Sequence, residues 1–186
     1  DIRVSLVTSH AGFCCWAVQK ASVHLERSVF SAPLRSALVC FGQTRLEAVS
    51  STIAETGVHG VCARGECVLF LVDCSVLDAA VRGLYAYANA SVVLEGCSFR
   101  RTVRPDKAAI EVSSAVPAPS DNGRQNQNQN QIQIQIQIQA GPLTKTKDKT
   151  KAKTDTNAKT KTKTSSLIMR NCRITDNAGV GVRIRG

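Results

Sequence analysis

Cysteine and histidine are the side chains best suited to bind a metal or to attack a substrate, and the chain has eight cysteines and three histidines. A structural zinc site needs two close pairs of such ligands, usually Cys-x-x-Cys or its histidine equivalent. The nearest approach to that spacing is Cys62 and Cys67, which four residues separate, and no second pair follows them at a suitable distance. We therefore predict no metal site and no cofactor.

Aromatic rings and arginines offer a different chemistry, the binding of a ligand without its transformation. The chain has a single tryptophan, Trp16, and two tyrosines, Tyr85 and Tyr87, although only 4% of its residues are aromatic. Ring planes beside guanidinium groups suit sugar rings, acidic groups or a protein partner. Whether these side chains can act together depends on the elements that carry them.

An internal repeat of 23 residues defines those elements. Five segments share one pattern: SVHLERSVF (22–30), RLEAVSSTI (45–53), VLFLVDCSV (68–76), SVVLEGCSF (91–99) and SLIMRNCRI (166–174). The central residues of the first four, Leu25, Ala48, Leu71 and Leu94, follow one another at equal intervals. A second apolar segment begins twelve residues after the centre, at Ala37, Gly60, Gly83 and Gly181. A weaker copy is centred on Ile2.

Within each copy, apolar and polar residues alternate with a period of two, which indicates short strands and not helices. A unit of this length cannot bury its apolar face alone, but stacked copies can, because each strand then pairs with its equivalent in the next copy. The sequence therefore predicts an all-β fold, a parallel β-helix of about six rungs over residues 1–113 and 165–186.

Phrases such as GVHGVCARGECVLFLVDCSV (57–76) and SSLIMRNCRITDNAGVGVRIRG (165–186) resemble the right-handed parallel β-helix repeats of the pectin-lyase-like superfamily. They are also similar in style to the β-helix repeats of F-box proteins. The resemblance implies a right-handed coil. It says little about function, because this scaffold hosts lyases, hydrolases, epimerases and non-catalytic binders.

The repeat register places the aromatic residues and several arginines on one outward face, that of the second apolar segment. The candidate ligand-binding residues are Trp16, Phe41, Arg64, Tyr85, Tyr87, Arg183 and Arg185. Two interpretations stay open for this face: it binds carbohydrate or protein, or it packs against the insertion or a segment outside this sequence. An apolar stripe on the first strand of the repeat, Phe70, Val93 and Ile168, is the second candidate surface.

Catalytic carboxylates are not evident in the same register. Enzymes on the scaffold of the resembled superfamily typically cluster aspartates, with calcium or a nearby base, on one outward face. Here no two acidic residues occupy the same position in adjacent copies at the two outward positions that flank the central residue, so we predict no catalytic residue. His24 and Glu47 are expected to make only a surface contact.

A low-complexity insertion, residues 114–164, interrupts the repeat. It contains QNQNQN, QIQIQIQIQ and a run in which lysine alternates with threonine. Such composition cannot bury enough apolar surface to offset chain entropy, so we expect most of it to be disordered. The alternating Ile132, Ile134, Ile136 and Ile138 leave an alternative, an added or assembling strand.

The insertion also holds most of the net charge of +10, since its lysine-rich part, 145–163, carries eight lysines and two aspartates. The remaining chain is only mildly basic and the lysine run has no aromatic residues for base stacking, so nucleic acid is an unlikely partner. No apolar run is long enough for a membrane span.

The other cysteines fit the repeat. Cys74, Cys97 and Cys172 share one inward position with Ser28 and Ser51, and Cys15 and Cys40 also fall inward, whereas Cys62 and Cys67 are expected to be exposed. Buried, unpaired thiols favour a reducing, intracellular compartment. The sequence starts at Asp1 and its only methionine is Met169, so we expect that the natural start is missing and that targeting cannot be judged.

These observations favour a non-catalytic recognition or scaffold module that binds carbohydrate or a protein partner. Two alternatives are a fragment of a carbohydrate-active enzyme with its catalytic rungs elsewhere, and the substrate-binding repeats of an F-box-type adaptor.

Overall fold

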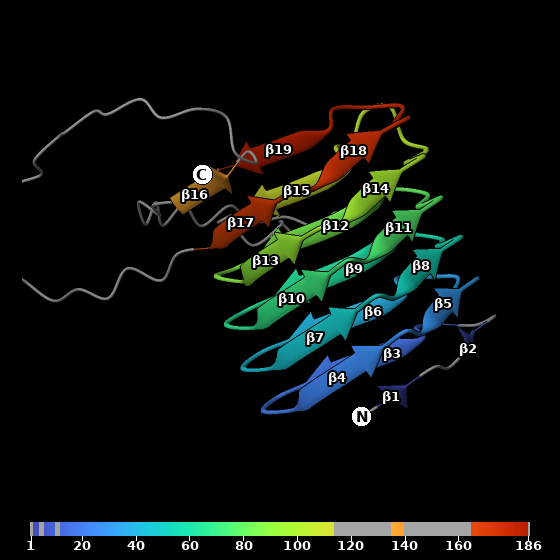
Figure 1. The fold of residues 1–186 in the computed structure, drawn as a ribbon, viewed down its shortest axis with the longest axis vertical. Helices are drawn as coiled ribbons and strands as arrows, with labels where there is room; N and C mark the ends of the chain where they lie inside the picture. Colours follow the sequence, from blue (N-terminus) through green and yellow to red (C-terminus); the bar gives the residue numbers. More distant parts are fainter. Residues whose placement is uncertain (1, 4–5, 10–11, 114–134, 140–164, 186) are drawn as a thin grey trace, which may run out of the picture.

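The computed structural model describes residues 2–3, 6–9, 12–113, 135–139 and 165–185. Over these residues the chain winds into a solenoid whose strands run parallel to their neighbours in three sheets (Figure 1). Each full rung supplies one strand to each sheet. The expected all-β parallel solenoid is therefore confirmed, with three strands per repeat.

The strands of each sheet follow one another in stacking order. Sheet A consists of β1 (Ile2–Arg3), β4 (Ser22–Glu26), β7 (Arg45–Val49), β10 (Val68–Val72), β13 (Ser91–Glu95), β17 (Ser166–Arg170) and β16 (Gln135–Gln139). Sheet B consists of β2 (Leu6–Thr8), β5 (Val29–Ser31), β8 (Thr52–Ala54), β11 (Ser75–Leu77), β14 (Ser98–Arg100) and β18 (Arg173–Thr175). Sheet C consists of β3 (Cys15–Val18), β6 (Leu38–Phe41), β9 (His59–Arg64), β12 (Arg82–Tyr87), β15 (Ile110–Ser113) and β19 (Val182–Arg185).

Strand pairing reproduces the 23-residue register. Leu25 pairs with Ala48, Ala48 with Leu71, and Leu71 with Leu94. The weak first copy is also present, since Ile2 pairs with Leu25. In the described part of the chain, five full rungs follow this shorter first one, so the full turns number about five where the sequence predicts about six rungs.

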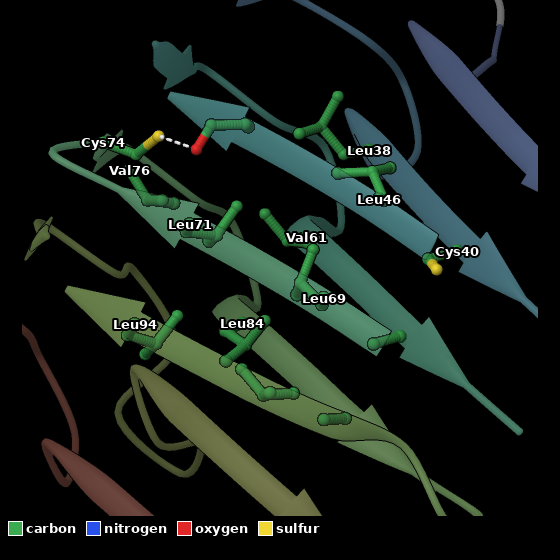
Figure 2. Close-up of a cluster of buried hydrophobic side chains, with 14 of the residues drawn as sticks. Leu38, Cys40, Leu46, Val61, Leu69, Leu71, Cys74, Val76, Leu84 and Leu94 are labelled. Atoms are coloured by element: carbon green, nitrogen blue, oxygen red, sulfur yellow. Dashed lines mark hydrogen bonds between the residues drawn. The ribbon is translucent and has the colours of Figure 1, made fainter. Parts of the chain in front are cut away.

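The core lies between the sheets and consists of the inward residues of every rung. Leu46, Leu69 and Leu71 from sheet A face Val61 and Leu84 from sheet C, and all five are fully buried (Figure 2). Sheet B closes the third side with Phe30, Ile53, Val76 and Phe99. Stacked copies of one position thus form continuous apolar columns, which is how a short repeat obtains a core.

The corners of the solenoid depend on left-handed residues that recur once per rung. Between sheets A and B these residues are Arg27, Ser50, Asp73, Gly96 and Asn171, and between sheets B and C they are Ala32, Glu55, Asp78, Arg101 and Asp176. Between sheets C and A they are Gln19, Gly42, Gly65 and Ala88. Only three of them are glycine, so most corners place a side chain in a conformation that costs about 1–2 kcal/mol.

The insertion leaves the solenoid and returns to it at one point. Ser165 Oγ donates a hydrogen bond to the Ser113 carbonyl at 3.2 Å, so the last described residues on either side of it are in contact. Within the insertion only Gln135–Gln139 is described, as β16, which pairs in parallel with β17. This strand corresponds to the alternative of an added strand. The expected disorder concerns 114–134 and 140–164, which lie outside the described residues, as do Ile132 and Ile134.

Candidate functional site

The outward face of sheet C carries all the candidate binding residues that the sequence predicts. Pairing places Trp16, Val39, Cys62, Tyr85, Glu111 and Arg183 in one column, and Val18, Phe41, Arg64, Tyr87, Ser113 and Arg185 in the next. Trp16 and Phe41 are exposed, at 62% and 41%, while the two tyrosines are half-buried. The register, and with it this face, could therefore be read from the repeat.

The aromatic rings and guanidinium groups on this face pack against one another in a continuous stack. Tyr85 and Tyr87 are stacked, with ring centroids 4.8 Å apart and an interplanar angle of 29°. Arg82 Cζ lies 4.3 Å from the Tyr85 centroid, and Arg64 Cζ lies 5.6 Å from that of Tyr87 and 5.0 Å from that of Phe41. The flat faces of both tyrosines are thus already in contact with neighbouring groups.

Arg82 and Glu111 form an ion pair at one end of this stack, and the sequence analysis did not single out either residue. Arg82 Nε lies 2.9 Å from Glu111 Oε2, and the side chains are 11% and 3% exposed. Arg185 Nε, one strand further, lies 3.5 Å from the other oxygen of Glu111. The carboxylate is therefore held between arginines from the strands on its two sides.

His59, like Arg82, belongs to this face but was not indicated by the repeat register. Its ring lies 5.2 Å from that of Tyr85, and its position pairs with Arg82. Burial, reinforced by the positive charge of Arg82, lowers the pKa of His59 to about 3. The imidazole is neutral at physiological pH, and its buried Nδ1 has no hydrogen-bond partner among the described residues.

The two tyrosine hydroxyls are donors on this face. Burial is the main cause that raises the pKa of both Tyr85 and Tyr87, so both remain protonated well above neutral pH. Together with the exposed Arg64, they supply O–H and N–H donors on this face. Such donors suit carboxylates and other anions.

The opposite end of the face, at β3 and β6, is apolar. Trp16 contacts Phe13 with centroids 5.0 Å apart, and Arg35 lies over the Phe13 ring at 5.8 Å. Val18 is 38% exposed beside Trp16. The face thus changes along the solenoid axis from exposed aromatic groups to arginines.

Sheet A offers less chemistry. Its apolar stripe includes Phe70, but the guanidinium of Arg45 covers that ring at 4.3 Å. His24 Nδ1 lies 3.9 Å from Glu47 Oε2, which is the surface contact that the sequence predicts. Across the described ranges, no three histidine, cysteine, aspartate or glutamate side chains are grouped so that they could hold a metal ion.

The cysteines follow the expected pattern with one correction. All eight are described and none is in a disulfide bond. Cys74 and Cys97 are buried at 1%, as expected, but Cys67, expected to be exposed, is fully buried in the core. It directly precedes β10 and contacts Cys40 inside the solenoid. Cys62 is half-buried, and burial raises its pKa to about 11.

Comparison with known families decides the classification. The family model described as "Right handed beta helix region" matches residues 11–186. The chain belongs to the right-handed β-helix family. This assignment also gives the hand of the coil, in agreement with the sequence resemblance. No curated protein and no solved structure matches the chain. In the described part of this β-helix, no helix could cross a membrane.

Proposed function

We propose that this β-helix is a non-catalytic recognition module, and that the outer face of sheet C binds an extended, acidic segment of a protein partner. The observation that carries the proposal is the stack of Arg82, Tyr85, Tyr87, Arg64 and Phe41. Each guanidinium in it lies over a ring, at 4.3 to 5.6 Å from Cζ to the ring centroid, so it is oriented before a ligand arrives. Preorganised groups lose less entropy on binding.

The charge of the face favours an acidic ligand. Arg64 is exposed, and no carboxylate in the described part of the chain forms an ion pair with it. Arg183 uses one guanidinium nitrogen to donate to the Asp106 carbonyl at 3.2 Å, a neutral partner. Both can pair with carboxylates of a ligand, and arginine does so with two parallel hydrogen bonds.

The occupied tyrosine faces favour a peptide over a sugar. Carbohydrate rings bind proteins by lying flat on aromatic faces, and here neighbouring side chains already cover those of Tyr85 and Tyr87. Beside the covered rings, the face offers the guanidinium of the exposed Arg64 and the exposed rings of Trp16 and Phe41. These two rings would anchor an apolar side chain of the same ligand.

The dimensions of the face set the ligand's length. From Trp16 to Arg183 there are five rung spacings of about 4.8 Å, or about 24 Å in all. An extended peptide rises about 3.4 Å per residue, so about seven residues would span the face. A ligand of this kind fits the substrate-binding repeats of an F-box-type adaptor.

A carbohydrate ligand is the second candidate, and the exposed ring of Trp16 is what favours it. A fragment of a carbohydrate-active enzyme is less well supported, because the outward positions of β4, β7, β10 and β13 in sheet A show no pair of carboxylates on adjacent rungs. On either alternative, binding would depend on Trp16 and not on the arginines.

Fluorescence polarisation with labelled heptapeptides tests the proposal. One peptide would contain glutamates and a terminal leucine, a second would replace glutamate with glutamine, and neutral and acidic oligosaccharides would be competitors. We expect binding of the acidic peptide, and its loss in Arg64→Glu and in the double variant Tyr85→Ser, Tyr87→Ser.

Arg173→Glu is the matched control, because it makes the same charge reversal at an exposed position of sheet B. Equal loss in this control would mean non-specific attraction and would contradict the proposal. Binding of neutral sugars that is lost in Trp16→Ala but not in Arg64→Glu would favour the carbohydrate alternative.

A further inference from the structure

A column of hydroxyl and thiol groups runs along the solenoid beside the corner between sheets A and B. Its members are Ser28, Ser51, Cys74, Cys97 and Cys172, one from each full rung. Each donates to the carbonyl oxygen two residues earlier, at 2.9 Å for the serines and 3.3 Å for the cysteines. All five side chains therefore point the same way, and the three sulfurs lie above one another.

Cys97 and Cys172 occupy equivalent positions on adjacent rungs. The residues that follow them, Ser98 and Arg173, are paired, and Arg173 N donates to the Cys97 carbonyl at 2.8 Å. Adjacent parallel strands lie about 4.8 Å apart, which falls within the roughly 4.4–6.8 Å between Cα atoms that a disulfide requires.

The two thiols differ in accessibility. Cys97 is buried at 1%, whereas Cys172 is half-buried because β18 is the outermost described strand of sheet B. An external oxidant would reach Cys172 first. Cys97 would then be the nearest thiol able to react with the oxidised sulfur, and Cys74 lies one rung further inside.

We propose that Cys97 and Cys172 are a redox-active pair, which a low-molecular-weight disulfide such as oxidised glutathione converts into a disulfide bond between the last two rungs. The Cys172 thiolate attacks one glutathione sulfur, forms a mixed disulfide and releases one glutathione thiolate. The Cys97 thiolate then attacks the Cys172 sulfur and releases the second. Two protein thiols are oxidised, one glutathione disulfide is reduced, and the two thiol protons end on the released glutathiones.

The bond would attach the rung that follows the insertion to the rung that precedes it. It would close a loop that contains all of 114–164, and long closed loops give the largest loss of entropy in the unfolded chain. The neighbouring Cys97 thiol and burial raise the pKa of Cys172, so the reaction is slow at neutral pH and accelerates as pH rises.

Peptide mapping of the full chain after incubation with oxidised glutathione tests the proposal. After alkylation of free thiols, trypsin places the three cysteines of the column in separate peptides, because it cuts after Arg64, Arg82, Arg100, Arg170 and Arg173. We expect peptide 83–100 linked to peptide 171–173, with a mass two hydrogens below the sum of the two free peptides. The oxidised chain should also melt at a higher temperature than the reduced chain, and dithiothreitol should reverse this shift.

Serine variants are suitable controls, because Ser28 and Ser51 already make the same hydrogen bond in this column. Cys74→Ser should still form the linked peptide and gain the same thermal shift, whereas Cys172→Ser should do neither. Three results would each overturn the proposal. They are a link between peptides 65–82 and 83–100, a mixed disulfide that persists on Cys172, and a chain that stays fully reduced at pH 9.

Discussion

Arg82 and Glu111 form the most buried ion pair among the described residues, with Arg82 Nε and Glu111 Oε2 2.9 Å apart on adjacent strands of sheet C. The pair holds Arg82 against the Tyr85 ring, 4.3 Å from its centroid. The stability of the last rungs and the order of the proposed binding face thus depend on the same contact.

Glu111→Gln should therefore be strongly destabilising. It removes the negative charge but keeps the shape, and so leaves Arg82, which is only 11% exposed, without a countercharge. Loss of one partner of a buried pair costs about 3–5 kcal/mol. Urea unfolding followed by circular dichroism would measure the change in the free energy of unfolding.

Asp78→Asn is the control for this experiment. Asp78 accepts two hydrogen bonds from Arg101, at 2.6 and 2.7 Å, but both side chains are well exposed, at 38% and 49%. Exposed pairs contribute little in water. If both variants lost the same free energy of unfolding, burial would not explain how much the Arg82–Glu111 pair contributes to stability.

His59 should make the fold sensitive to acid. Its pKa is about 3 in the folded chain, because of burial and Arg82, and about 6.5 when unfolded. Between these two pH values, His59 binds a proton in the unfolded chain but not in the folded chain. The contribution of His59 to the free energy of unfolding is therefore fully present above pH 6.5 and is lost as pH falls towards 3, by up to about 4 kcal/mol. His59→Gln should show a flatter decline between pH 7 and 4. If stability fell equally with pH in the variant and the wild type, His59 would not be the cause of the acid sensitivity.

Gly60 should not tolerate even a methyl group. A Cβ at this position would lie 2.5 Å from Val76 Cγ1 and 2.6 Å from the Gly83 carbonyl oxygen, and the backbone atom cannot move without disturbing the next rung. Gly60→Ala should destabilise by about 1–3 kcal/mol through overpacking. Gly181→Ala is the matched control, since its Cβ would meet only Ile174 Cγ2, at 3.4 Å. Thermal melts would compare the two variants, and only Gly60→Ala is expected to melt at a clearly lower temperature.

The repeat made the strand register predictable, because the period of 23 residues places each position over its copy. The inward columns of Leu25 and Phe30 and the outward column of Tyr85 follow from that period alone. The sequence could not show how the side chains on the outer face pack. The positions of Arg82 and His59 lie at the start of their strands, before the small residue from which the second segment was counted, so both were missed.

The buried Cys67 shows a second limit. It lies next to a turn glycine and a glutamate, Gly65 and Glu66, and local composition therefore indicated a solvent-exposed turn. In the solenoid the chain has already turned inward at this point, and the thiol contacts Cys40 in the core. The left-handed corners were equally invisible, because Arg27, Ser50 and Asp73 share no chemistry.

Ala88→Gly should stabilise the fold. Ala88 has a φ of 55° at the corner where the two preceding rungs have Gly42 and Gly65. Glycine adopts this conformation without the steric cost of a Cβ, and part of that gain is offset by the greater entropy of the unfolded chain, so we expect up to about 1 kcal/mol.

Gly65→Ala is the reverse experiment at the same corner. Its φ is 81°, and a Cβ there would lie 3.3 Å from Gly42 N, so this variant should melt at a lower temperature. Opposite shifts of the melting temperature are expected for the two variants. If both variants were less stable, the left-handed conformation at the corner of Gly42, Gly65 and Ala88 would not be the cause of the change in stability.

Deletion of residues 116–163 should leave the solenoid folded. Ser113 and Ser165 are already in contact, with Ser165 Oγ 3.2 Å from the Ser113 carbonyl oxygen, so three residues suffice to join the strands on either side. The shortened chain loses β16, which pairs only with β17 among the described strands, so the last rung alone should become less stable. We expect the sheet circular dichroism and cooperative unfolding to persist, with a lower melting temperature. Gln137→Pro, which removes one ladder hydrogen bond from β16 in the full chain, should also lower the melting temperature. Loss of cooperativity in the deletion variant would instead mean that β16 is required for the fold of the whole solenoid.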